Sequence, residues 1–207
     1  MKSILVGITG NIGTGKTLLS NFFKENGVPI YSSDNKCKIL MNKSNIIRKN
    51  IIKFFGIKSY NGKKLNKNFL SKIIFKDINA LKILCSIVHP WVKLDFEKWK
   101  KNNNYPYIIK ESALIFEFEN YKEFDLIIIL TSYLKIILKR IIKRDKLSKE
   151  EIINRLNNQI NINNIKNIKN ISNKIFFIEN NSSITKLKKY SISLHKKIIK
   201  NIKYGKR

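Results

Sequence analysis

The chain has 207 residues, a formal net charge of +28, 43% hydrophobic residues and 11% aromatic residues. This composition can bury a core and excludes wholesale disorder, and 3 Pro and 8 Gly exclude collagen-like and Pro-rich linker architectures. The 2 Cys exclude a disulfide framework, and no apolar run is long enough to span a membrane. We therefore expect a cytoplasmic enzyme or binding protein without membrane attachment.

The first residues predict a βαβ unit. Residues 3–8 form a short apolar run, which is typical of a buried parallel strand. Residues 10–15 form a glycine-containing loop, and residues 17–26 predict an amphipathic helix that Gly27 ends. A second strand is predicted over residues 28–31.

From residue 34 to about 99 the pattern is helical and irregular, with a turn at Asn61-Gly62 and a helix beginning near Trp91 after His89-Pro90. Beyond it, strands are predicted over 107–110, 125–131 and 175–178, and helices over 133–146 and 184–202, with a capping box at 148–151 opening a further helix. Residues 161–173 are low in complexity and predict a frayed helix or a loop. Strands that alternate with helices predict an α/β fold built on a parallel sheet.

Residues 10–17 carry the pattern G-x-x-x-x-G-K-[ST] of a phosphate-binding P-loop, between a predicted strand and a predicted helix. Glycines let backbone N–H groups turn around phosphate oxygens, and the following helix adds its N-terminal amides. We expect Lys16 to reach the β- and γ-phosphates of ATP and the Thr17 hydroxyl to bind Mg²⁺. The predicted ATP-binding residues are Gly10, Asn11, Ile12, Gly13, Thr14, Gly15, Lys16 and Thr17.

The length and the absent motifs narrow the class of P-loop protein. The strings D-x-x-G and N-K-x-D that a GTPase requires are absent, and the chain is short for a motor ATPase. A small kinase fits best. Such an enzyme needs a carboxylate near the acceptor hydroxyl and a basic lid over the phosphates.

Asp34 is the predicted carboxylate, because it directly follows the second strand at the carboxyl edge of the sheet. It can accept a proton from a substrate hydroxyl or orient Mg²⁺, and a helix N-cap is the structural alternative. The predicted lid includes Arg140 and Arg144, four residues apart on one helical face. The chain has 5 Arg against 37 Lys, so Arg at these positions favours bidentate phosphate contacts over a solvated helix face.

Several segments, in the same order along the chain, resemble motifs of the dephospho-CoA kinase family over about residues 3–160. Val6–Thr17 is similar to the family's P-loop, and Ile30–Asp34 to its strand ending in x-S-D. Val88–Pro90 is similar to its L-H-P motif, and Ser112–Glu117 to its P-L-L-F-E motif. Lys139–Asp145 is similar to its R-x-x-x-R-D motif, and Arg155–Gln159 to its R-[IM]-x-x-Q motif. The chain departs from the family at Leu18, which replaces a second hydroxyl after the P-loop, and at Ser32, which replaces the first acid of D-A-D. After Gln159 the family's pattern is not recognisable.

The resemblance implies an α/β P-loop kinase with a parallel β-sheet core flanked by helices, a helical substrate-binding insertion and a helical lid. Within a single domain of residues 1–207, the core would comprise 1–34, 105–137 and 174–207. The insertion would cover about 35–104 and the lid about 138–160.

The resemblance also implies the reaction, in which the γ-phosphate of ATP passes to the ribose 3′-hydroxyl of dephospho-CoA with Mg²⁺ as cofactor. Lys16, Arg140 and Arg144 would neutralise charge on the transferring group, and Asp34 would orient or deprotonate the hydroxyl. The backbone amide of Leu18 would serve the α-phosphate. The dephospho-CoA side would comprise Asp34, His89, Leu114 and Glu117, although a core role for His89 and a cap or ion-pair role for Glu117 are alternatives. A monomer or small homo-oligomer is expected.

Three other functions are weighed against this one. A nucleoside monophosphate kinase would share the P-loop, the base and the lid, but His89-Pro90 and residues 114–117 favour a dephospho-CoA kinase. A nucleic-acid-binding protein would gather its basic residues on one face with aromatic residues between them, whereas here the Lys residues are dispersed. With 37 Lys, 39 Ile and 27 Asn, all written by A/T-only codons, the positive charge is better explained by genome composition. An inactive paralogue would not be expected to keep Lys16, Thr17 and Asp34.

Overall fold

The computed structural model of the protein describes residues 3–116, 120–159, 165 and 174–204. It divides the chain into two compact units, one comprising residues 1–31 and 102–207 and the other residues 32–101. Most of the predicted low-complexity segment and Glu117 lie outside the described residues.

The first unit is built on a sheet of five strands in the order β2-β5-β1-β6-β7. The strands are β1 (Ile4–Gly10), β2 (Ile30–Ser32), β5 (Tyr107–Glu111), β6 (Leu126–Thr131) and β7 (Ile175–Glu179). The central strand β1 pairs in parallel with β5 and β6, and β6 pairs in parallel with β7. The predicted parallel sheet is therefore confirmed.

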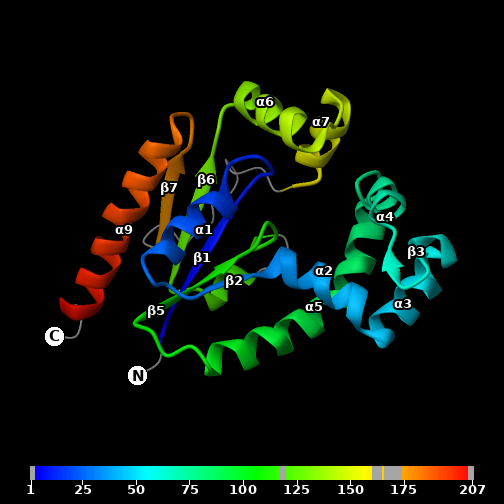
Figure 1. Ribbon diagram of the computed structural model, residues 1–207, viewed down its shortest axis with the longest axis horizontal. Coiled ribbons are helices and arrows are strands. Elements are labelled where there is room, and N and C mark those ends of the chain that lie inside the picture. The colour runs from blue at the N-terminus through cyan, green and yellow to red at the C-terminus, as the bar shows by residue number, and fades with distance from the viewer. Residues whose placement is uncertain (1–2, 117–119, 160–164, 166–173, 205–207) are drawn as a thin grey trace. The chain divides into compact units, whose positions relative to one another are not determined.

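Helices α1 (Lys16–Glu25) and α9 (Ile184–Tyr204) pack together against this sheet. The core between them is made by apolar side chains from both helices and from β1, β5, β6 and β7; among them are Val6, Ile8, Phe23, Ile109, Ile128, Leu130, Leu187 and Leu194. Figure 1 shows α9 running alongside β7 and α1 lying across the strands. After β6 the chain forms the helix pair α6 (Leu134–Asp145) and α7 (Lys149–Asn157). No helix among the described residues is long and apolar enough to cross a membrane.

The second unit is helical. It contains α2 (Ser33–Lys43), α3 (Asn45–Phe55), α4 (Lys67–Ile74) and α5 (Ile78–Lys101), with a short hairpin of β3 (Tyr60–Asn61) and β4 (Lys64–Leu65) after the 3-10 turn Ile57–Ser59. The predicted turn at Asn61-Gly62 is confirmed, since Gly62 adopts φ of 58° between the two hairpin strands. The Tyr60 hydroxyl donates to the Met41 carbonyl at 2.6 Å and links the hairpin to α2.

The prediction that a helix begins near Trp91 is wrong. Pro90 lies inside the single helix α5, which starts at Ile78. Proline removes the N–H that would bond to the Ser86 carbonyl, but both residues are exposed, so water can hydrate that carbonyl. The apolar stripe continues past the proline with buried Val88 and Val92, and this packing holds the helix together.

Local signals elsewhere placed the helix ends well. The capping box at Ser148 is present, with the Glu151 N–H donating to its hydroxyl at 3.1 Å. Gly27 follows α1 with φ of 79°. The second strand starts two residues later than predicted, because the Val28 N–H bonds back to the Phe23 carbonyl at 3.2 Å and extends the helix C-cap.

Candidate active site

The loop between β1 and α1 has the backbone that a P-loop requires. Gly10, Gly13 and Gly15 adopt φ of 143°, 80° and 101°, which L side chains rarely adopt. A Cβ on Gly10 would overlap the Leu130 carbonyl oxygen of the neighbouring strand. The dihedral angles therefore require glycine at all three positions, and the close approach of β6 requires it at Gly10 as well.

The first turn of α1 faces the same loop. Gly15 is its N-cap and offers no side-chain acceptor, so the leading N–H groups have no cap from that residue. Lys16, Thr17 and Leu18 form this turn. The N-terminus of a helix, where the leading amides and the positive end of the dipole lie, is suited to an anion such as a phosphate group.

Lys16 is held over the loop. Its Nζ donates to the Gly10 carbonyl at 2.7 Å and to the Asn11 carbonyl at 3.2 Å, and only 9% of the residue is exposed. The ammonium group therefore lies at the loop and is already largely removed from solvent. A positive charge in such a site interacts with phosphate oxygens more strongly than an exposed lysine does.

Thr17 contacts an acidic residue that the sequence interpretation missed. Its Oγ1 donates to Oε1 of Glu111 at 2.8 Å, and Glu111 is 3% exposed at the end of β5. Parallel pairing sets Glu111 opposite Ile8 in β1 and so brings it to the P-loop. The available signal was an acid at the end of the strand Tyr-Ile-Ile-Lys-Glu, which is apolar apart from its lysine.

Arg140 and Arg144 of α6 have different surroundings. Arg140 donates to the Gly13 carbonyl at 3.3 Å, to the Ser132 hydroxyl at 3.1 Å and to the Asn180 carbonyl at 2.9 Å. Burial lowers the pKa of Arg140 from its usual value. The guanidinium nevertheless stays charged, because the usual pKa of arginine is very high. Arg144 instead forms two hydrogen bonds with Asp145, at 2.8 and 2.7 Å.

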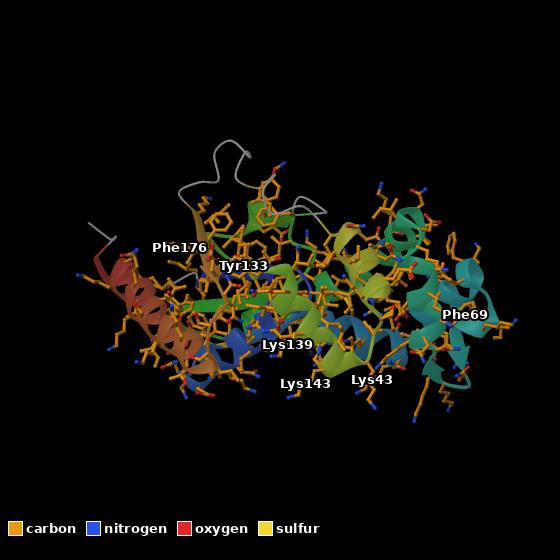
Figure 2. The ribbon with its side chains drawn as sticks, turned by 90° about the horizontal axis from the view of Figure 1, so that it is seen from above. Lys43, Phe69, Tyr133, Lys139, Lys143 and Phe176 are labelled. Atoms are coloured by element: carbon orange, nitrogen blue, oxygen red, sulfur yellow. The ribbon has the colours of Figure 1, made fainter. Side chains whose placement is uncertain are left out.

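The exposed side of α6 carries lysines. Lys139 and Lys143 project from this side, as Figure 2 shows, and both are exposed. At the end of α7, Gln159 reaches back to the P-loop, where its Oε1 accepts from the Ile12 N–H at 2.8 Å. Both α6 and the end of α7 thus contact the loop through a side chain.

Asp34 and His89 belong to the second unit. Asp34 lies half-buried in the first turn of α2, whose N-cap is Ser32, so the N-cap alternative for Asp34 is not realised. Burial, reinforced by the charge of Asp34, raises the pKa of Cys37 to about 12. His89 lies half-buried in α5.

Leu114 lies in the segment after β5, half-buried, and its N–H donates to the Ser112 hydroxyl at 3.2 Å. Glu117 lies outside the described residues. Among the predicted site residues of the first unit, the structure thus brings Lys16, Thr17 and Arg140 to the P-loop.

A glycine loop on a parallel sheet, with a buried lysine over it and a hydroxyl–carboxylate pair at its end, defines a P-loop phosphotransferase. The chain belongs to the dephospho-CoA kinase family, whose sequence model matches residues 4–186.

Individual relatives agree with this assignment. The chain is 33% identical over 159 residues to the dephospho-CoA kinase of Bacteroides fragilis strain YCH46, covering 76% of this chain and 78% of that one. It is 28% identical over 201 residues to the dephospho-CoA kinase of Listeria monocytogenes serotype 4b, covering 95% and 98%.

Two solved structures share the fold. A crystal structure from Thermus thermophilus has a TM-score of 0.78 at 22% identity, and the Campylobacter jejuni dephospho-CoA kinase has a TM-score of 0.62 at 24% identity. Each comparison covers 95% of this chain and 98% of the other. The predicted α/β P-loop kinase fold is confirmed.

Proposed function

We propose that the protein transfers the γ-phosphoryl group of ATP to the ribose 3′-hydroxyl of dephospho-CoA, giving CoA and ADP. The observation that carries the proposal is the family match over residues 4–186, which spans the P-loop, Asp34 and both lid arginines. In the reaction a bond forms between the 3′-oxygen and the γ-phosphorus. The bond from that phosphorus to the oxygen shared with the β-phosphate breaks.

The proton of the 3′-hydroxyl goes to Asp34 in this proposal. Asp34 lies half-buried in the first turn of α2. An ionised carboxylate is acceptor-only, so it can orient the hydroxyl and then take its proton. On the resemblance to the family, His89, Leu114 and Glu117 are assigned to the dephospho-CoA side.

Charge that develops on the transferring group would be neutralised by Lys16 and the arginines of α6. Lys16 and Arg140 are already held by loop carbonyls, so they need little rearrangement when the nucleotide binds. Preorganised charges of this kind stabilise a transition state because they need no reorganisation during the reaction. The P-loop and the first turn of α1, residues 10–18, would bind the phosphates of ATP. Within it the Ile12 N–H is bonded to Gln159 and the Thr14 N–H to the Asn11 carbonyl, so the phosphates would be bound by other N–H groups of this segment.

The residues around Thr17 fit a magnesium ion. Mg²⁺ prefers oxygen ligands, keeps several waters and is usually bound by one or two protein groups together with substrate phosphates. The Thr17 hydroxyl and the buried Glu111 carboxylate, 2.8 Å apart, are such groups. Among the described residues no group of three or more His, Cys, Asp and Glu is arranged to hold a metal. When bound, the ion would supply positive charge between the β- and γ-phosphates.

The test is ADP release by the purified protein with ATP and Mg²⁺. The acceptors are dephospho-CoA, AMP, UMP, dTMP and shikimate, each alone, and a sample without acceptor. We expect stimulation by dephospho-CoA alone, with CoA identified by its mass. Stimulation by a monophosphate instead would contradict the proposed substrate.

Two variants test the roles, each with a matched control. Lys16→Ala should collapse turnover, whereas Lys139→Ala, at an exposed position of α6, should not. Asp34→Asn should collapse turnover while ATP still binds, whereas Asp77→Asn, at an exposed acid that caps the Asn79 N–H, should match the unaltered protein. Near-normal turnover in Asp34→Asn would remove Asp34 from the mechanism.

A further inference from the structure

We infer that Asn180 is a positioning residue for phosphoryl transfer, which holds the P-loop and Arg140 in one fixed arrangement. The inference rests on the proposed kinase function. Asn180 follows β7 directly, is 5% exposed, and belongs to no motif in the sequence interpretation.

The residue joins three parts of the first unit. Its side-chain Nδ2 donates to the Thr14 carbonyl of the P-loop at 2.8 Å, and its backbone N–H donates to the Thr131 carbonyl at the end of β6 at 2.8 Å. Its backbone carbonyl accepts from Arg140 at 2.9 Å and from the Ser132 hydroxyl at 2.8 Å. One buried residue is thus bonded to the loop, to β6 and to α6.

The side-chain bond sets the direction of a P-loop peptide. In a trans peptide the C=O and the following N–H point in opposite directions. The bond from Asn180 to the Thr14 carbonyl therefore turns the Gly15 N–H away from Asn180. Gly15 also permits the contact, because a Cβ there would lie 2.5 Å from Nδ2 of Asn180.

The main-chain bond orients the arginine. Arg140 has acceptors at Gly13, Ser132 and Asn180, and Ser132 itself donates to Asn180. The planar guanidinium fork uses its donors in fixed directions, so three acceptors leave little freedom for the group. Asn180 consequently links Arg140 to the P-loop. Its backbone carbonyl binds the arginine, and its side chain binds the Thr14 peptide of the loop.

The amide chemistry of Asn180 is required for this role. The Thr14 carbonyl needs a donor, and aspartate of the same shape offers none when ionised. An ionised carboxylate there would place two oxygens against each other and would leave the carbonyl without its partner. A protonated carboxyl has one O–H donor and can restore the bond.

The adjacent Asn181 provides a matched control. It uses its oxygen rather than its amide nitrogen, since Oδ1 accepts from the Tyr133 N–H at the start of α6 at 2.8 Å. Replacing Asn181 by Asp keeps this acceptor and adds a negative charge at a helix N-terminus, which is favourable. The same change at two neighbouring residues therefore removes a hydrogen bond at one and preserves it at the other.

The experiment measures kcat and KM for ATP and for dephospho-CoA in Asn180→Asp, Asn180→Ala and Asn181→Asp between pH 5.5 and 8.5, with Tm for each. We expect Asn180→Ala to lower kcat/KM for ATP by about tenfold to a hundredfold at every pH. KM for dephospho-CoA should change little. Asn180→Asp should approach the unaltered protein at low pH and lose activity relative to it as the pH rises. Asn181→Asp should match the unaltered protein throughout.

Equal losses in Asn180→Asp and Asn181→Asp, or a lower Tm with unchanged kcat and KM for ATP, would overturn the inference. Binding of a non-hydrolysable ATP analogue, measured by calorimetry, separates this inference from the proposed function. If no acceptor stimulates turnover, the function fails, and weaker analogue binding in Asn180→Ala than in Asn181→Asp still supports the positioning role. Equal analogue binding in those two variants would refute it.

Discussion

The phenolic oxygen of Tyr107 lies 2.7 Å from Nδ1 of His195, so a single hydrogen bond joins β5 to α9. Tyr107 is fully buried, and burial, with a smaller contribution from Tyr105, raises the pKa of its hydroxyl. The phenol therefore stays protonated within this hydrogen bond. Burial also lowers the pKa of His195 below its ordinary value of 6.5.

This pair predicts that acid destabilises the fold. As the pH falls below about 6.5, the unfolded chain protonates His195 more readily than the folded chain does, so the unfolded state binds more protons. The free energy of unfolding should therefore decrease from pH 7.5 to pH 5.5. Urea titrations at both pH values should show a smaller decrease in His195→Asn, which keeps an acceptor but does not titrate, than in His89→Asn. Equal pH dependence in the two variants would contradict the assignment.

Removing the acid beside Thr17 should impair the handling of Mg²⁺. In Glu111→Gln the Thr17 hydroxyl loses its charged acceptor, and we expect kcat to fall by about tenfold to a hundredfold, with a higher Mg²⁺ concentration needed for half-maximal rate. Steady-state rates across a Mg²⁺ titration measure this. Glu123→Gln is the control, because Glu123 is an exposed acid whose Oε2 lies 4.0 Å from Lys110. An unchanged Mg²⁺ dependence in Glu111→Gln would exclude the role.

Two glycines with positive φ should respond differently to alanine. Gly15 has φ of 101° and would press a Cβ against Asn180, whereas Gly56 has φ of 82° and no heavy atom within 4 Å of an added Cβ. Gly56→Ala should lower stability by about 1–3 kcal/mol through backbone strain and leave KM for ATP unchanged. Gly15→Ala should raise KM for ATP by at least about tenfold, since both strain and overlap act on the phosphate loop. Thermal unfolding and steady-state kinetics on both proteins compare these outcomes.

The geometry of Arg140 should matter more than its charge. Lysine at this position keeps the charge but cannot reach three acceptors with a planar fork, so Arg140→Lys should lower kcat/KM for ATP by about tenfold. Arg144→Lys, at a site where the guanidinium pairs with the neighbouring Asp145, should have a smaller effect on ATP affinity. The two single variants, assayed side by side, decide between geometry and charge. A near-normal kcat/KM for ATP in Arg140→Lys would show that charge alone is sufficient.

Features written in local sequence were predictable. The P-loop followed from glycine spacing between a strand and a helix, and the capping box at Ser148 from residues three apart. The helix across Pro90 was not predictable from local rules, because packing of Val88 and Val92 outweighs the missing N–H. The buried partners Glu111 and Asn180 depend on strand order and register. These bring Glu111 to Thr17, from which it is separated by 94 positions in the chain, and Asn180 to Thr14, from which it is separated by 166 positions. Asn180 had no local signal at all in a chain with 27 Asn.

The two thiols have a practical consequence for measuring motion. Cys85 is buried, and the pKa of about 12 keeps Cys37 protonated at neutral pH, so neither presents the thiolate that reacts with maleimides and other alkylating probes. A cysteine introduced at an exposed position of α6, such as Lys143, would therefore take a fluorescent label selectively. The native chain thus offers a low background for spectroscopy of α6 and α7 during turnover, without prior removal of its own cysteines.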